Sequence, residues 1–100
     1  MFEKNKDRHI TRGVKEKISN LTYLILWEMI DEMEVPKKDC LQSFDLRIKD
    51  ETEGLMEIIH HQDENSYTNS IEFYTVNPVN AKIHVLDVGE YSTMFLEGEL

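Results

Sequence analysis

The stretch from Ala81 to Leu96, AKIHVLDVGEYSTMFL, decides the fold of this chain. Apolar and β-branched residues flank Gly89-Glu90, a pair that suits a two-residue hairpin turn. Because successive strand side chains point to opposite faces, this turn assigns every residue of the hairpin to one side. One side carries Ala81, Ile83, Val85, Met94 and Leu96, and the other carries His84, Leu86, Val88, Tyr91, Thr93 and Phe95. The stretch therefore predicts a hairpin with two apolar sides.

The preceding sequence predicts one helix and several strands. Ser19 or Asn20 is typical of a helix N-cap, and no glycine or proline interrupts the helical pattern from Leu21 to Met33. Pro36 disfavours helical geometry in the residue before it, so the helix should end by Val35. The remaining strands are expected at His9–Val14, Leu41–Lys49, Leu55–His61 and Ser70–Val76, with a loop over Gln62–Asn69.

These elements predict an α+β fold, with one main helix packed on a largely antiparallel sheet of five to six strands. Residues 1–8 are expected to form a polar lead, and residues 9–97 a single domain. A single helix covers only one face of a sheet. Either the sheet curls strongly, or its second face meets another surface.

The helix raises a related question about its own surface. Its expected core face consists of Ile18, Thr22, Ile25, Leu26, Met29, Ile30 and Met33, with Tyr23 at the margin. Three large apolar residues, Leu21, Leu24 and Trp27, stand among the acidic residues of the other faces. Either another part of the fold covers them, or they form a surface patch.

The charge of the chain limits its partners. Of 100 residues, 20 are acidic and 11 are basic, for a net charge of −9. Residues 1–17 carry six basic and three acidic residues, so the rest of the chain has a net charge of −12. Such a body repels phosphate, and we expect no nucleic-acid partner. No apolar stretch is long enough to span a membrane. Cys40, the single cysteine, has no internal partner, and we expect a cytoplasmic location.

The reactive side chains do not form a recognisable catalytic or metal-binding set. Ser92 and Asp87 should be neighbours in the hairpin, but His84 should point to the opposite face. His60 and His61 should likewise point to opposite faces, so they are a poor pair of ligands for one ion. We therefore expect no catalytic residue, no bound metal and no cofactor, and an enzyme is the less favoured interpretation.

Several segments resemble one known family. They are Thr11–Val14, Leu26–Asp31, Leu41–Leu46, Ile59–Gln62, Ala81–Asp87 and Gly89–Met94. The chain resembles the small bacterial proteins grouped as domain of unknown function 960, found mainly in Gram-positive bacteria. The resemblance covers roughly His9 to Leu96, and the Tyr91–Met94 end is its most specific part. It implies a stand-alone cytoplasmic protein and supplies no activity or site residue.

The leading hypothesis is a non-enzymatic module that binds another protein, or a second copy of itself, through an apolar surface. The candidate interface residues are Trp27, Leu24, Leu86, Val88, Tyr91 and Phe95. The alternative is a small-molecule binding protein or minor enzyme with a pocket between helix and sheet, with Tyr23, Tyr74, His84 and Tyr91 as its polar groups. A nucleic-acid mimic that uses its acidic surface is a third hypothesis.

Overall fold

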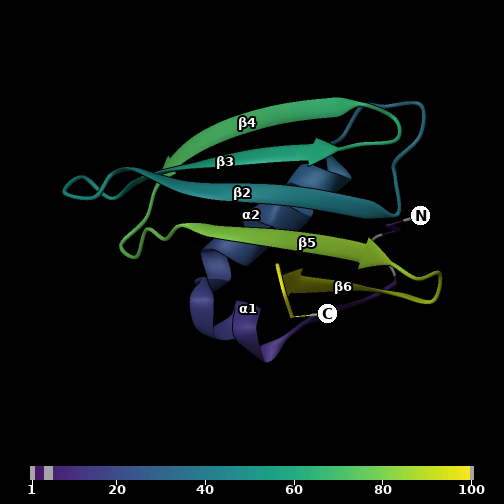
Figure 1. Cartoon of the computed structure of the whole chain (residues 1–100), viewed down its shortest axis with the longest axis horizontal. Coiled ribbons are helices and arrows are strands. Elements are labelled where there is room, and N and C mark those ends of the chain that lie inside the picture. The colour runs from purple at the N-terminus through teal and green to yellow at the C-terminus, as the bar shows by residue number, and fades with distance from the viewer. Residues whose placement is uncertain (1, 4–5, 100) are drawn as a thin grey trace.

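The computed structural model describes residues 2–3 and 6–99 of the chain. Six strands form one sheet, and helix α2 lies behind β2 and β5 in the view of Figure 1. The elements are, in chain order, β1 (Asp7–Ile10), α1 (Arg12–Lys17), α2 (Asn20–Asp31), β2 (Leu41–Asp50), β3 (Leu55–Gln62), β4 (Tyr67–Tyr74), β5 (Ala81–Asp87) and β6 (Tyr91–Leu96).

The strand order in the sheet is β1-β6-β5-β2-β3-β4. Strand β1 runs parallel to β6, and every other neighbouring pair is antiparallel. The predicted α+β class and the largely antiparallel sheet are therefore confirmed. The sheet is open, with β1 and β4 as its edges, and the described residues form two helices where the sequence predicted one main helix.

The closing hairpin has the predicted register. Asp87 lies opposite Ser92, and Val85 lies opposite Met94. The Val88 amide donates to the Tyr91 carbonyl at 3.0 Å, which closes the turn. Gly89 has a φ of 102°, a backbone conformation that side chains with a Cβ rarely adopt.

The N-terminal part differs from the prediction. A first strand is present, but its predicted bounds of His9–Val14 are wrong, because β1 spans Asp7–Ile10 and α1 begins at Arg12. Thr11 forms the boundary, since its hydroxyl accepts a hydrogen bond from the Val14 amide at 3.3 Å and caps α1. The segment predicted to be a polar lead over residues 1–8 already contains the start of β1, and the Phe2 side chain is buried in the core.

Strand β4 also begins earlier than predicted. The sequence predicted a loop over Gln62–Asn69, but β4 starts at Tyr67 and ends at Tyr74. Its pairing with β3 is regular from Gln62 opposite Tyr67 to Leu55 opposite Tyr74. The polar residues at the start of β4 are held by backbone pairing, which does not depend on apolar side chains.

The core lies between α2 and the sheet. Ser19 caps α2, because its hydroxyl accepts a hydrogen bond from the Thr22 amide at 3.2 Å. From α2, Leu26, Met29 and Ile30 are buried, as predicted. They pack in one cluster with sheet residues that all point toward the helix side, which include Phe44, Leu46, Met56, Ile58, Ile83, Val85 and Met94.

Candidate functional site

The sheet face opposite α2 has a partly exposed, largely apolar end. Leu41 lies opposite Leu86, and Val88 pairs with Tyr91 beyond the end of β5. Leu41, Val88 and Tyr91 are 42%, 50% and 41% exposed. We call Leu41, Leu86, Val88 and Tyr91 the open-face patch. Thr93 and His9 lie beside it on the same face, where the His9 ring meets the edge of the Tyr91 ring at 5.2 Å.

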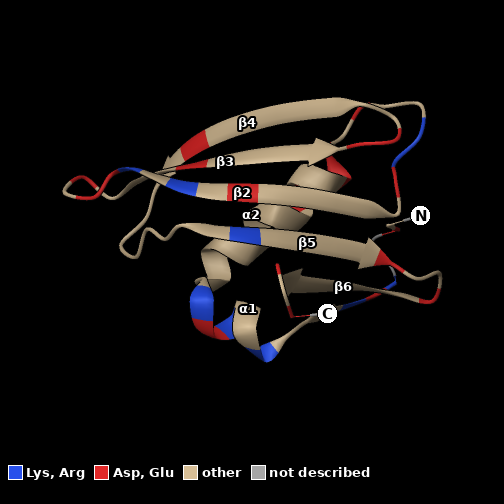
Figure 2. Ribbon diagram, in the orientation of Figure 1, with Lys and Arg blue, Asp and Glu red and all other residues tan. Residues whose placement is uncertain are grey.

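Most charged residues of this face lie at its other end, although Asp7 of β1 lies directly opposite Tyr91. Figure 2 shows them mainly in the left half of strands β2 to β5, whereas β6 carries none. On the open face they include Asp45, Arg47, Lys49, Glu57, Glu72 and Lys82. The open-face patch therefore consists of uncharged residues on a chain whose net charge is −9.

The other candidate interface residues occupy different environments. Trp27 is 5% exposed, and the Arg8 guanidinium covers its ring at 4.7 Å. Cover within the fold is thus the outcome for Trp27, whereas Leu21 and Leu24 are exposed. Phe95 lies on the open face but is buried, with its ring 5.6 Å from that of His84. In the single chain, Leu86, Val88, Tyr91 and Leu24 remain partly or largely accessible.

Sequence reasoning missed a polar relay on the open face. The Ser43 hydroxyl lies 2.9 Å from His84 Nδ1, and His84 Nε2 lies 3.3 Å from a Glu97 carboxylate oxygen. Ser43 and His84 are cross-strand neighbours, a contact that required the β2–β5 register. The order of groups resembles a nucleophile, base and acid. However, Ser43 sits in a central strand paired on both sides, so the surrounding amides are used by the sheet and not presented to an oxyanion.

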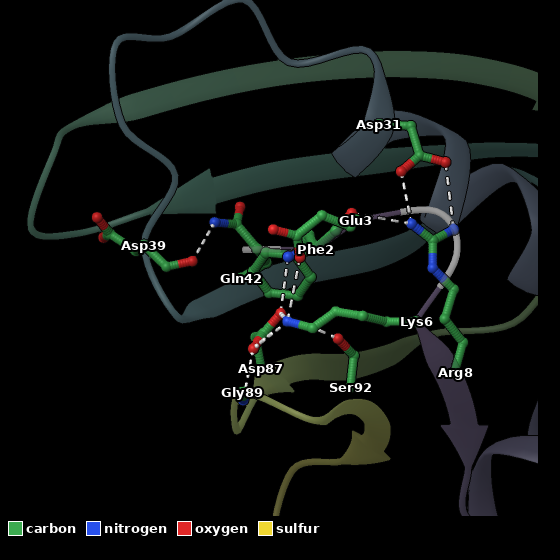
Figure 3. A network of polar contacts seen from close by, with 10 residues as sticks. All are labelled: Phe2, Glu3, Lys6, Arg8, Asp31, Asp39, Gln42, Asp87, Gly89 and Ser92. Carbon is green, nitrogen blue, oxygen red and sulfur yellow. Dashed lines mark hydrogen bonds and ion pairs between the residues drawn. The ribbon is translucent and has the colours of Figure 1, made fainter.

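Ser92, Asp87 and His84 do not come together, as the hairpin register predicted. Ser92 Oγ lies 3.3 Å from an Asp87 carboxylate oxygen, while His84 is on the opposite face. Figure 3 shows Asp87 at the centre of a polar network on the helix side. Its carboxylate accepts hydrogen bonds from the Phe2 amide at 2.7 Å, the Gly89 amide at 2.8 Å and the Lys6 ammonium at 2.7 Å.

This network fixes the start of the chain. Burial favours the neutral acid, but the hydrogen bonds from Lys6, Phe2 and Gly89 outweigh it and lower the pKa of Asp87 to about 2. Nearby, Arg8 forms a two-pronged ion pair with Asp31 at the end of α2, with a shorter distance of 2.6 Å. The N-terminal segment is therefore held against both β5 and α2.

A second polar network is buried around His60. The Gln42 side-chain nitrogen donates to the Gln62 side-chain oxygen at 2.7 Å and to the Asp39 carbonyl at 2.9 Å. The Gln42 oxygen must then accept from His60 Nε2, which lies 2.7 Å away. His60 Nε2 therefore carries a proton, and Nδ1 has no hydrogen-bond partner among the described residues. Burial, with smaller effects of His61 and Lys38, lowers the pKa of His60 to about 4.

The two adjacent histidines point apart. His60 is fully buried against the Phe44 ring at 4.4 Å, whereas His61 lies on the open face, 3.4 Å from Asp63. Cys40 is exposed beside a small cavity of about 200 Å³. Within residues 2–3 and 6–99, no three His, Cys, Asp or Glu side chains are grouped so that they could hold a metal ion.

A groove runs between α2 and the edge strand β4. Its volume is about 320 Å³. Ile25 and Met29 from the helix and Ile71 from the strand supply its apolar lining, with Glu28, Glu32, Tyr67 and Asn69 as the other residues. Three of the polar groups proposed for a small-molecule pocket, Tyr74, His84 and Tyr91, are not in this groove, because they point to the open face.

Comparison with known proteins identifies relatives without an assigned activity. The family described as "Staphylococcal protein of unknown function (DUF960)" matches residues 7–99. A solved structure, "Crystal structure of the protein of unknown function from Enterococcus faecalis", has a TM-score of 0.83 and 22% sequence identity. The match covers 99% of this chain and 94% of that chain, and it shows a shared fold. No curated protein matches the chain. Neither described helix is long and apolar enough to cross a membrane.

Proposed function

The chain belongs to the DUF960 family, and we propose that it is a non-enzymatic protein-interaction module whose docking surface is the open-face patch. A second copy of the chain is the partner that this surface suits best. The carrying observation is the set of partly exposed apolar side chains of Leu41, Leu86, Val88 and Tyr91 on a sheet face opposite the helix. Leaving large apolar side chains in water forgoes about 1.5–3 kcal/mol for each one.

Charge supports a second copy as the partner. Two chains of net charge −9 repel one another over most of their surfaces. None of the four patch residues is charged, and Asp7 at the edge of the patch is the acidic residue that a second copy has to accommodate. Two sheets commonly pack face to face, and a two-fold axis brings the same patch of each copy together. A cytoplasmic location belongs to the same proposal, supported by the exposed free thiol of Cys40.

The test uses two matched valines. Val88→Glu places a charge in the open-face patch, where Val88 is 50% exposed. Val76→Glu makes the same chemical change at a residue that is 93% exposed and outside the patch. Phe95 is less suitable, because a charge at this buried position would unfold the chain.

The parent protein and Val76→Glu should have about twice the chain mass of 11.8 kDa by light scattering at high concentration. Val88→Glu should be monomeric with an unchanged circular dichroism spectrum. A parent protein that remains monomeric at high concentration would contradict the proposed self-association. An equal loss of mass in both variants would show that added charge, rather than the patch, controls assembly.

The alternative, a small-molecule site between helix and sheet, has a physical counterpart in the groove between α2 and β4. That groove lies at the edge of the sheet, beside unpaired backbone, which favours a different occupant.

A further inference from the structure

Strand β4 offers a free backbone edge. Within the part of the chain that the structure describes, β4 pairs with β3 alone, so its other edge has no partner strand. Proteins usually protect such edges with proline, lysine, bulges or short strands. β4 has eight residues, no proline or lysine, and an uninterrupted register with β3. The opposite edge, β1, has only four residues, including Asp7 and Arg8.

The groove lies on the helix side of this free edge. A segment added to β4 as a seventh strand would direct every second side chain to the helix side, at intervals of roughly 6.6–6.8 Å. Ile71 of β4 and Ile25 and Met29 of α2 line the space that these side chains would enter. Apolar side chains of the added strand would therefore replace water in a cavity of about 320 Å³.

The helix wall of the groove is acidic. Glu28 and Glu32 are four residues apart on α2, so they are neighbours on one face of the helix. Both are exposed, and neither forms an ion pair with another described residue. They complement lysine or arginine, and the net charge of −9 would steer a basic segment toward the protein.

A second copy of the chain fits this edge poorly. Two-fold pairing of β4 with β4 places both α2 helices on the same side of the combined sheet, because paired residues of antiparallel strands share a face. Glu28 and Glu32 of one copy would then face the same acidic residues of the other across the joint. The groove therefore favours a partner of opposite charge.

We propose that the edge of β4 and the groove beside α2 bind an extended peptide segment in which every second residue is either apolar or basic. The backbone of the segment pairs with β4, its apolar side chains contact Ile25, Met29 and Ile71, and its basic side chains reach Glu28 and Glu32. This surface is separate from the open-face patch, so the proposal does not depend on self-association.

The probe is a fluorescently labelled nine-residue peptide of sequence TLTLTKTKT. Its second and fourth residues are leucine and its sixth and eighth are lysine, so all four side chains lie on one face of the extended peptide. Binding is followed by fluorescence anisotropy with the parent protein. The variant Glu28→Lys/Glu32→Lys should weaken binding by about tenfold or more. The control Glu16→Lys/Glu51→Lys makes the same change in net charge at exposed positions outside the groove, and should leave affinity within about twofold.

Two further readings test how the peptide binds. Alternate amides of β4 should gain hydrogen-exchange protection. A peptide that is N-methylated at both its central threonine and the following lysine should bind poorly, because one of two consecutive amides must donate to β4. Val88→Glu, used above to test self-association, should bind the peptide like the parent. Equal losses in the two double variants, unchanged β4 amides, or self-association through β4 would each overturn the proposal.

Discussion

Asp87 shows how one side chain can organise a chain terminus. It receives hydrogen bonds from Phe2, Lys6, Gly89 and Ser92, groups separated by up to 85 positions in the sequence. The same carboxylate supports the closing turn and the N-terminal segment. These contacts join the closing turn to the N-terminal segment, and His84 lies on the opposite face, as predicted.

Replacing Asp87 with asparagine should release this segment. Asp87→Asn removes the charge that pairs with Lys6, and the free energy of unfolding should fall by about 1.5–3 kcal/mol, the range for hydrogen bonds to charged groups. The segment around Phe2 should also become more sensitive to protease. Asp45→Asn is the control, because Asp45 meets Arg47 only at 3.9 Å, and it should change stability by less than about 0.5 kcal/mol in urea unfolding.

His60 should make stability depend on pH. The pKa of His60 is about 4 in the folded chain, below its ordinary value of 6.5. Between these values the unfolded chain binds a proton that the folded chain does not, so the free energy of unfolding falls as pH falls from 6.5 to 4. The full effect is about 3 kcal/mol.

Urea unfolding at several pH values checks this prediction against His60→Gln, which should flatten the dependence in that window. Asp87 acts in a lower window, because its pKa falls from 3.8 to about 2, and its contribution is lost as pH drops through that range. A parent protein equally stable at pH 7 and pH 4.5 would show that His60 becomes charged without cost in the folded chain.

At the scale of elements, the turns depend on glycines in two different ways. Gly54 has a φ of 74°, and an added Cβ would lie 2.4 Å from the Thr75 carbonyl oxygen. Gly89 has a φ of 102° but open space around it. Both positions disfavour other residues by backbone conformation, while Gly54 also has a steric limit.

Gly54→Ala should therefore be the more damaging substitution. We expect a loss of about 2–4 kcal/mol from backbone strain and the clash together, against about 1–2 kcal/mol for Gly89→Ala from strain alone. Chemical denaturation of both variants measures the difference. Equal losses would indicate that the β4–β5 connection moves away from Gly54 without cost.

The elements that were predicted correctly are those marked by a turn motif or by a regular spacing of apolar residues. The hairpin register followed from Gly89-Glu90, and the buried face of α2 followed from its helical period. Helix α1 was missed because six residues that include Gly13 give too short a pattern. The start of β4 was missed because Tyr67 to Asn69 do not alternate.

The candidate surfaces divide in the same way. The open-face patch could be predicted in part, because Leu86, Val88 and Tyr91 lie within one hairpin, whereas Leu41 joins them only through the β2–β5 register. The groove could not, because it depends on where α2 lies relative to β4. The cover over Trp27 comes from Arg8, which precedes it by nineteen positions in a segment expected to be a polar lead. Such contacts have no signal in neighbouring residues.

For the whole molecule, charge governs which large partners can approach. The net charge of −9 should prevent specific binding of duplex DNA at ~150 mM salt. A gel retardation assay with the intact protein checks this, and the same assay at low salt controls for weak binding by the basic N-terminal residues. Sequence-specific retardation at ~150 mM salt would contradict the prediction.

The pairing of β1 with β6 has a consequence for how the protein is made. β1 precedes the other five described strands in the sequence, yet its parallel neighbour β6 follows them all. Until Tyr91–Leu96 emerges, β1 has no strand to join, and β5 presents an unfilled edge. A nascent chain stalled before Tyr91 therefore has two unpaired strand edges, one on β1 and one on β5. We expect chaperones and proteases to recognise that intermediate, because the edges of β1 and β5 that β6 joins are both unpaired until β6 is made.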